Sequence, residues 1–209
     1  MTRRARTIAA FDFDGTITTG DSLKAFVVHT VGMARFLAAG ALAGPQMLGM
    51  AVGTCDRGTA KAAFLRHALR RIPRAELERA ARTFCTARLP AMIRPEMIER
   101  VNAHRALGHE IVLVSASPSL YLRIWASEMA GIGTLLSTQL ELDDRGFTGR
   151  FIGRNCWGPE KVARLQAWWR DDPPAKLFAY GDSRGDKEMA ELAHVAWIRG
   201  TGPLPPLAP

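Results

Sequence analysis

Cysteine is scarce in this sequence: Cys55, Cys85 and Cys156 are the three cysteines among 209 residues. They are too few and too scattered for a disulfide framework or a CxxC metal site. Such sparse use of cysteine is typical of a reducing compartment, so we expect a cytoplasmic protein. The five histidines show no metal-ligand spacing, and no function is assigned to them.

Compositional bias is also lacking. The chain has 19 Gly, 12 Pro, 47% hydrophobic and 23% charged residues, which excludes collagen-like and wholly disordered chains. The start, MTRRARTIAAFDFDG, reaches acidic residues after only a few apolar ones, so it does not fit the apolar core of a signal peptide. The length fits one large domain, or a core domain that carries a smaller insertion.

Acidic residues are fewer than basic ones, 20 against 28, and the formal net charge is +8. This charge favours anionic partners such as phosphorylated substrates, nucleic acid or acidic lipid headgroups. The basic residues are mostly arginines spread along the chain, and the run Arg70–Arg74 fits a solvated helix face. Because no recognition motif accompanies the charge, nucleic-acid binding is not expected.

Short apolar runs alternate with helical patterns over most of the chain. We expect strands at residues 8–14, 109–114, 176–180 and 195–198, and a β-hairpin made of residues 135–142 and 147–153. We expect helices at about 119–130, after Gly158-Pro159, and up to about 193. This alternation predicts an α/β fold with a Rossmann-like, mostly parallel sheet.

Residues 21–90 show a helical pattern throughout, with breaks expected at Gly53, Gly58 and Pro73. The chain is therefore expected to divide into two domains. An α/β core domain would comprise residues 1–20 and 91–209, and a helical cap domain, residues 21–90, would be inserted after the first strand.

Within the expected cap, residues 36–53 run for 18 residues without a charge. This length touches the lower limit for a membrane span, but the run is rich in Ala and Gly and is interrupted by Pro45 and Gln46. Packing inside the cap is the favoured interpretation, because the small residues permit close helix contacts. Contact with a membrane surface is the alternative, and a true span is the least favoured.

Three polar pairs follow the expected strands: Asp12 and Asp14, Ser115 and Ser117, and Asp182 and Asp186. Ligands of open α/β sheets bind at the carboxyl ends of the strands, so these side chains are expected to share one site. In an extended segment, residues two apart point the same way. One carboxylate of the first pair can then act as a nucleophile while the other moves a proton. Metal binding or turn capping is the alternative for that pair.

The other motifs suit a phosphate and a metal. Asp182 and Asp186 are hard oxygen ligands for Mg²⁺, although acidic residues in such loops are also ordinary helix caps. Ser115 and the backbone N–H groups before the helix near Ser119 form an anion site. Lys161 lies near the start of a helix, where a surface lysine is the simpler interpretation.

Together and in this order, the four motifs are much more specific. The sequence DFDGT at residues 12–16, then Val114-Ser115, Lys161, and Gly181-Asp182 with Asp186 resembles the haloacid dehalogenase superfamily of phosphohydrolases. The resemblance covers nearly the whole chain. The helical insertion directly after the first motif is similar to the cap of the phosphoserine-phosphatase-like branch, subfamily IB.

The resemblance implies a magnesium-dependent phosphatase that acts on phosphate monoesters. Asp12 would be the nucleophile and form an aspartyl-phosphate. Asp14 would protonate the leaving alcohol and then activate water, so its pKa is expected to be raised. Ser115 would donate a hydrogen bond to the transferring phosphoryl group, and Lys161 would offset the negative charge.

The resemblance also implies the metal ligands. Mg²⁺ would be held by the Asp12 side chain, the Asp14 backbone carbonyl and Asp182, with support from Asp186. A dianionic phosphate repels a carboxylate nucleophile, so the reaction needs a metal, a lysine and backbone donors to hold the charge.

Substrate specificity would depend on the cap. Phosphoserine phosphatases resemble this chain at Asp21 but carry a glutamate there, which binds the serine ammonium group. The position of their cap arginine falls near Ala63 in this sequence. We expect Lys61 or Arg66 to substitute for it, with Ser117 as a further substrate-binding residue. Capping of the helix that begins at Ser22 is an equally weighted alternative for Asp21.

Four functions remain open at this point. The first is hydrolysis of a phosphorylated small molecule. A lipid-phosphate phosphatase of the phosphatidylglycerophosphate type is the second, because the apolar run and the basic surface suit the inner face of a membrane. Phosphoserine phosphatase is the third. A phosphate-binding regulatory module without activity is the fourth, and the presence of both Asp12 and Asp14 disfavours it. The same residues also permit phosphoryl transfer to an alcohol, and the sequence gives no prediction of the oligomeric state.

Overall fold

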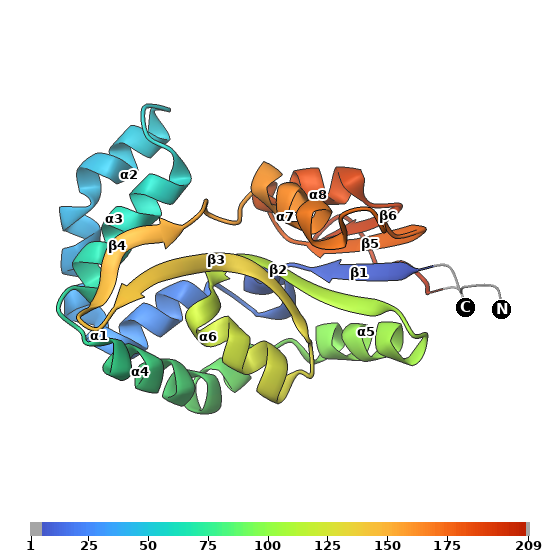
Figure 1. Cartoon of the computed structure of the whole chain (residues 1–209), viewed down its shortest axis with the longest axis horizontal. Helices are drawn as coiled ribbons and strands as arrows, with labels where there is room; N and C mark the ends of the chain where they lie inside the picture. The colour runs from blue at the N-terminus through green and yellow to red at the C-terminus, as the bar shows by residue number, and fades with distance from the viewer. Residues whose placement is uncertain (1–5, 208–209) are drawn as a thin grey trace.

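A six-stranded sheet in the order β4-β3-β2-β1-β5-β6 forms the centre of the computed structural model (Figure 1). The structure describes residues 6–207, so residues 1–5 and 208–209 of the expected core domain lie outside the described residues. The strands are β1 (Thr7–Phe11), β2 (Glu110–Pro118), β3 (Thr134–Asp143), β4 (Gly146–Ile152), β5 (Lys176–Gly181) and β6 (Val195–Ile198).

Helices cover both faces of this sheet. The helices are α1 (Ser22–Leu42), α2 (Gly44–Ala51), α3 (Arg57–Leu69), α4 (Arg74–Ala87), α5 (Pro95–Ala106), α6 (Ser119–Ile124), α7 (Pro159–Trp169) and α8 (Lys187–Leu192). In Figure 1, α7 and α8 lie on one face of the strands and α5 and α6 on the other. Alternate residues of each central strand are buried on opposite faces, as period-two alternation requires: Ile8 and Ala10 join one apolar cluster, and Ala9 and Phe11 join the other.

The predicted α/β fold with a mostly parallel sheet is confirmed. All neighbouring strands pair in parallel except β3 and β4, which form the predicted antiparallel hairpin. Strand β2 runs further than expected, through Ser115 to Pro118, with an irregularity between these two residues. The helix expected at 119–130 is confirmed: α6 (Ser119–Ile124) continues without a break into a π-helical turn, Trp125–Met129.

The strand register brings the polar motifs together. Phe11 of β1 is level with Leu113 of β2 on one side and with Tyr180 of β5 on the other. The residues that come next along these three parallel strands therefore emerge at one edge of the sheet. Asp12 lies at that edge, where its backbone N–H donates to the Tyr180 carbonyl at 2.9 Å.

Helices α1 to α4 lie between β1 and β2 in the chain and gather beyond this edge (Figure 1). Helix α3 packs against β4, where the Gly149 backbone has a φ of 96°. A Cβ atom at Gly149 would lie 2.7 Å from Cδ of Arg66, so the arginine stem rests directly on this glycine. The expected break at Gly58 is wrong: Gly58 lies in the first turn of α3, which Asp56 caps.

The apolar run at residues 36–53 forms the second half of α1 and all of α2. The expectation that it packs inside the cap is confirmed for Phe36, Ala39 and Ala43, which belong to or pack against the core. It is wrong for Leu37, Leu42 and Leu48, which are 61%, 62% and 67% exposed. Every residue of α2 is at least partly exposed. The physical reason is topological: α2 contacts α1 and α3, and its outer side has no further element to cover it.

Beneath the sheet, His104 of α5 is fully buried and belongs to a ring cluster. Its Nε2 lies 2.7 Å from the Tyr180 hydroxyl, and its Nδ1 lies 2.8 Å from Nδ1 of His109. Burial, with smaller effects of His109 and Arg100, lowers the pKa of His104 to about 3. The folded protein thus holds His104 neutral.

The stability of the protein should therefore depend on His104 below pH 6.5. In the unfolded chain this side chain takes up a proton near its ordinary pKa of 6.5, whereas the folded state takes it up only near pH 3. Stabilisation is complete above pH 6.5 and is lost as the pH falls, by up to about 1 kcal/mol per pH unit. Urea denaturation at about pH 7 and about pH 5.5 should show a steeper loss for the wild type than for His104→Gln; equal losses in the two proteins would contradict this assignment.

Candidate active site

A cavity of about 960 Å³ lies where the carboxyl ends of the central strands meet α1, α2 and α3. Asp12, Asp14, Ser117 and Asp182 line it on the side of the sheet, as the motif pattern predicts. Ser115, Lys161 and Asp186 lie directly behind them and are buried. The structure therefore brings the residues of all four motifs to one place.

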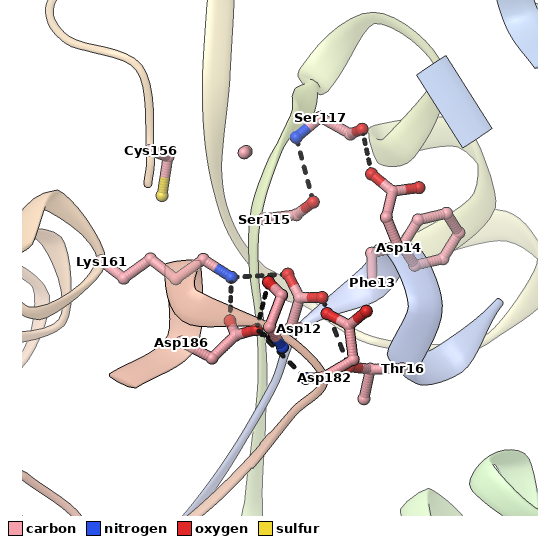
Figure 2. A network of polar contacts seen from close by, with 12 residues as sticks. Asp12, Phe13, Asp14, Thr16, Ser115, Ser117, Cys156, Lys161, Asp182 and Asp186 are labelled. Carbon is pink, nitrogen blue, oxygen red and sulfur yellow. Dashed lines mark hydrogen bonds and ion pairs between the residues drawn. The ribbon is translucent and has the colours of Figure 1, made fainter. Parts of the chain in front are cut away.

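The centre of the site is an ion-pair cluster around Lys161 (Figure 2). The Lys161 ammonium donates to Oδ1 of Asp12 and to Oδ1 of Asp186, each at 2.5 Å. All three side chains are almost completely buried. Lys161 lies in the first turn of α7. Because its side chain is buried there, the interpretation as a surface lysine is wrong. Its position behind the cavity suits it to offset negative charge at Asp12.

Burial shapes the titration of this cluster. It raises the pKa of Asp12 above its ordinary value, against the lowering effect of Lys161, and the neighbouring Asp186 and Asp14 raise it further. The pKa of Lys161 is also raised, because its attraction to the two carboxylates outweighs the burial that opposes it. Asp12 thus has a buried negative charge that a single lysine does not fully compensate.

Three carboxylates, those of Asp12, Asp182 and Asp186, offer oxygen atoms that all lie within 4.8 Å of one another. Burial, together with Asp186, raises the pKa of Asp182. This donor set of carboxylate oxygens suits Mg²⁺, which prefers hard oxygen ligands and binds through only one or two carboxylates. The acidic cluster therefore fits a metal site.

Asp186 also stabilises the loop that carries Asp182. Its Oδ2 accepts hydrogen bonds from the backbone N–H groups of Asp182 and Ser183, at 3.1 and 3.2 Å. Since its Oδ1 pairs with Lys161, both oxygens of Asp186 already have protein partners. The geometry suits a residue that holds the loop and supports a metal site more than one that serves as a main ligand.

Glycine 15 allows the first motif to approach Asp182. Its φ is 74°, and a Cβ atom built on it would lie 2.0 Å from Oδ2 of Asp182. No side chain fits into this gap. The glycine in DFDGT is thus required both by the turn and by the close approach of the carboxylate.

Asp14 lies beside Ser117, apart from Lys161 and Asp186 (Figure 2). The Ser22 backbone N–H donates to its Oδ1 at 2.7 Å, and the Ser117 hydroxyl donates to its Oδ2. Burial raises the pKa of Asp14, while both hydrogen bonds oppose that rise. This direction agrees with the expected behaviour of a group that must be protonated in one step and ionised in the next.

Ser115 is buried, and its Oγ accepts a hydrogen bond from the Ser117 backbone N–H at 3.0 Å. It lies between the Lys161 cluster and Asp14 in Figure 2. Its contact with a phosphoryl group stays a prediction.

The predicted substrate-binding residues of the cap separate in the structure. Asp21 and Lys61 line the cavity, but Arg66 lies on the other side of α3, beside Gly149, and does not line it. Asp21 also caps α1, since its Oδ1 accepts from the Lys24 backbone N–H at 2.9 Å. Lys61 donates to the Ala116 carbonyl at 2.6 Å, and burial lowers its pKa to about 8.

Arg57, Trp157 and Arg199 are among the basic and aromatic residues of the cavity to which the sequence assigned no role. The Trp157 ring lies between two guanidinium groups, that of Arg57 on α3 at 5.3 Å and that of Arg184 on the Asp182 loop at 5.7 Å. Arg199 donates to the Gly15 carbonyl at 2.8 Å. Its position directly after the last strand is the signal that could have found it, because that strand ends at the same edge of the sheet.

Known proteins match both the sequence and this geometry. Residues 9–191 match the family described as haloacid dehalogenase-like hydrolase. Protein CicA of Caulobacter vibrioides is 37% identical over 188 residues, which cover 89% of this chain and 82% of that protein.

Solved structures share the fold. A protein of unknown function from Bordetella pertussis Tohama I is 24% identical, with a TM-score of 0.77, and the match covers 92% of this chain and 89% of that one. A substrate-bound phosphoserine phosphatase is 14% identical, with a TM-score of 0.68 and coverage of 94% and 87%. The predicted similarity to the phosphoserine-phosphatase-like branch is confirmed at the level of the fold.

Because Gly15 lies so close to Asp182, adding a single methyl group at residue 15 should weaken metal binding. Gly15→Ala would force Asp182 away and strain the backbone by about 1 kcal/mol or more, so we expect the affinity for Mg²⁺ to fall at least tenfold in calorimetric titration. Gly133→Ala is the matched control, because a Cβ atom there meets nothing within 4 Å. An unchanged affinity in Gly15→Ala would show that Asp182 does not hold the metal.

Proposed function

This chain belongs to the haloacid dehalogenase-like hydrolases, and from that membership and the site geometry we propose that it is a magnesium-dependent phosphatase acting on phosphate monoesters. One observation carries the proposal: buried Asp12, paired with Lys161, lies within a carboxylate cluster at a cavity that Asp14 also lines. This arrangement combines a nucleophile, a fixed positive charge, metal ligands and a proton donor.

Asp12 would act as the nucleophile. One of its carboxylate oxygens attacks phosphorus, the bond between phosphorus and the ester oxygen breaks, and the product is an aspartyl-phosphate with a free alcohol. Lys161 stays charged beside Asp12 and compensates negative charge throughout. The pair also fixes the orientation of Asp12, because the ammonium binds Asp186 at the same time.

Asp14 would move the proton in both halves of the reaction. It gives a proton to the departing ester oxygen, and the carboxylate then takes one from the water that attacks the aspartyl-phosphate, which releases phosphate and restores Asp12. Its raised pKa favours the protonated form that the first half needs. The hydrogen bonds from Ser22 and Ser117 fix the orientation of its carboxylate beside the cavity.

The side chains of Asp12 and Asp182 and the backbone carbonyl of Asp14 would hold Mg²⁺, with Asp186 in support. When bound, the metal would supply positive charge that lets an anionic phosphate approach a carboxylate. The donor set described above fits this assignment.

The cap geometry also bears on the phosphoserine alternative. Asp21 and Lys61 both line the cavity, and their opposite charges suit the ammonium and the carboxylate of the serine part of that substrate. The capping bond of Asp21 to Lys24 does not exclude such a contact. A phosphoserine substrate therefore stays a second candidate. The alternative that is not an enzyme stays a phosphate-binding regulatory module.

The nucleophile can be tested directly. Asp12→Asn should lower Mg²⁺-dependent phosphate release from p-nitrophenyl phosphate at least about a thousandfold, since an amide cannot form the aspartyl-phosphate. Asp171→Asn, at an exposed carboxylate, is the control and should keep full activity. Comparable turnover in Asp12→Asn and the wild type would refute the mechanism. Phosphate binding without turnover in the wild type would favour the regulatory module.

Metal binding should also appear in the stability. Mg²⁺ at a large excess over its dissociation constant should raise the melting temperature of the wild type by several degrees, because the ion binds the folded state. Asp182→Asn should lose most of this rise. A rise of equal size in both proteins would place the ion elsewhere.

A further inference from the structure

The cavity has two chemically different ends. One end carries the carboxylates and Lys61, and the other is a wall of apolar side chains from the cap. That wall consists of Leu23, Phe36, Leu37, Met47, Met50 and Phe64. A leaving group bound across the cavity from the phosphate would therefore contact hydrocarbon. Such a wall stabilises an apolar leaving group and gives little to a small zwitterion.

The apolar wall continues onto the surface of the protein. Leu37 and Met47 line the cavity and are also 61% and 41% exposed. They belong to a set that we call the apolar face, made of Met33, Leu37, Leu42, Met47, Leu48 and Val52. These are six of the eight large apolar side chains that are exposed among the described residues. Exposed apolar side chains gathered in this way mark an interaction site.

The two helices that carry the apolar face, together with α3, have an excess of basic side chains. Residues 22–69, which form α1, α2 and α3, contain five basic side chains and one acidic side chain, Asp56. The combination of exposed leucine and methionine with a net positive charge on this group of helices complements an anionic lipid surface.

Helix α1 is long and apolar enough to span a membrane by length and composition, with a mean hydropathy of 1.5 and 17% of its apolar window buried. Its beginning is nevertheless part of the active site, because Ser22 binds Asp14 and Phe26 is buried in the core. The backbone turns at Gly32, at φ 78° and ψ 164°, before the exposed part begins. The geometry therefore suits contact with a lipid surface rather than a span.

We propose that the apolar face rests on an anionic lipid bilayer and that the substrate is a phosphate monoester of a lipid, drawn into the cavity along Leu37 and Met47. This inference rests on the proposed phosphatase activity and adds its substrate class. The phosphate reaches the carboxylate end while the hydrocarbon part stays against the apolar wall. The reaction is the hydrolysis described above, with a lipid alcohol as the leaving group.

The test compares one protein on two substrates. The first is phosphatidic acid in vesicles of phosphatidylcholine and phosphatidylglycerol, and the second is soluble p-nitrophenyl phosphate. Leu48→Asp changes an exposed residue that does not line the cavity, and Val52→Asp repeats the change one turn further on. Met129→Asp is the matched control: it introduces the same charge at an apolar side chain that is 44% exposed and contributes nothing to the cavity.

We expect each of the two apolar-face variants to lower the ratio of vesicle to soluble turnover roughly tenfold, the effect of keeping one large side chain out of the lipid. Met129→Asp should change this ratio less than twofold. In flotation, the wild type should rise with vesicles that contain phosphatidylglycerol and much less with pure phosphatidylcholine. Short-chain dihexanoyl phosphatidic acid, a soluble phosphate monoester, should be insensitive to Leu48→Asp.

Three outcomes would overturn the inference. The first is no flotation together with equal ratios in all variants. The second is equal hydrolysis of the short-chain and vesicle substrates without binding to vesicles. This result would mean that the substrate is a soluble amphiphile and not a lipid in a bilayer. The third is a dimer that Leu48→Asp dissociates, without flotation, which would make the apolar face a contact between two copies. Failure of the phosphatase proposal is separate: it would appear as no Asp12-dependent hydrolysis of p-nitrophenyl phosphate.

Discussion

The ion pairs of Lys161 are the interactions on which the site depends. One ammonium binds two buried carboxylates, at the end of β1 and in the loop after β5, and the lysine itself comes from α7. Three segments that are distant in the chain are thereby held at one point. Buried carboxylates without such a partner are strongly destabilising. The arrangement of the strand ends is thus enforced by charge as well as by the register of the sheet.

The cluster is nevertheless incompletely neutralised. Asp12, Asp182 and Asp186 bring three carboxylates to one place, and Lys161 supplies one positive charge. Burial raises the pKa values of Asp12 and Asp182, and repulsion from the neighbouring carboxylates adds to the rise. Glycine makes this close arrangement possible, because a Cβ atom at Gly181 would lie 2.4 Å from that of Asp186. A divalent cation is the counter-charge that such a group of oxygens lacks.

Sequence patterns predicted the parts of this site that depend on single strands. Asp12 and Asp182 follow apolar strands, and the parallel sheet brings strand ends together whatever the details of packing. The position of Arg66 could not be predicted, because it depends on which side of α3 packs against β4. The exposure of Leu48 could not be predicted either, since an apolar helix shows its apolar side chains but not whether another element covers them. The contact of Ser22 with Asp14 could not be predicted, because Ser22 donates through its backbone N–H and a backbone donor leaves no motif in the sequence.

Helix α1 joins the chemistry of the site to the apolar face. Its first residue donates to Asp14, and its later residues Phe36 and Leu37 form part of the cavity wall. Gly32 separates these two parts with a combination of φ and ψ that is open essentially to glycine alone. The first part can therefore pack against α4 and the core while the second part turns outward with its apolar side chains. Helix α1 thus contacts the proposed general acid, Asp14, at its first residue and carries part of the surface that would select the leaving group, while Gly32 lets its two halves lie in different surroundings.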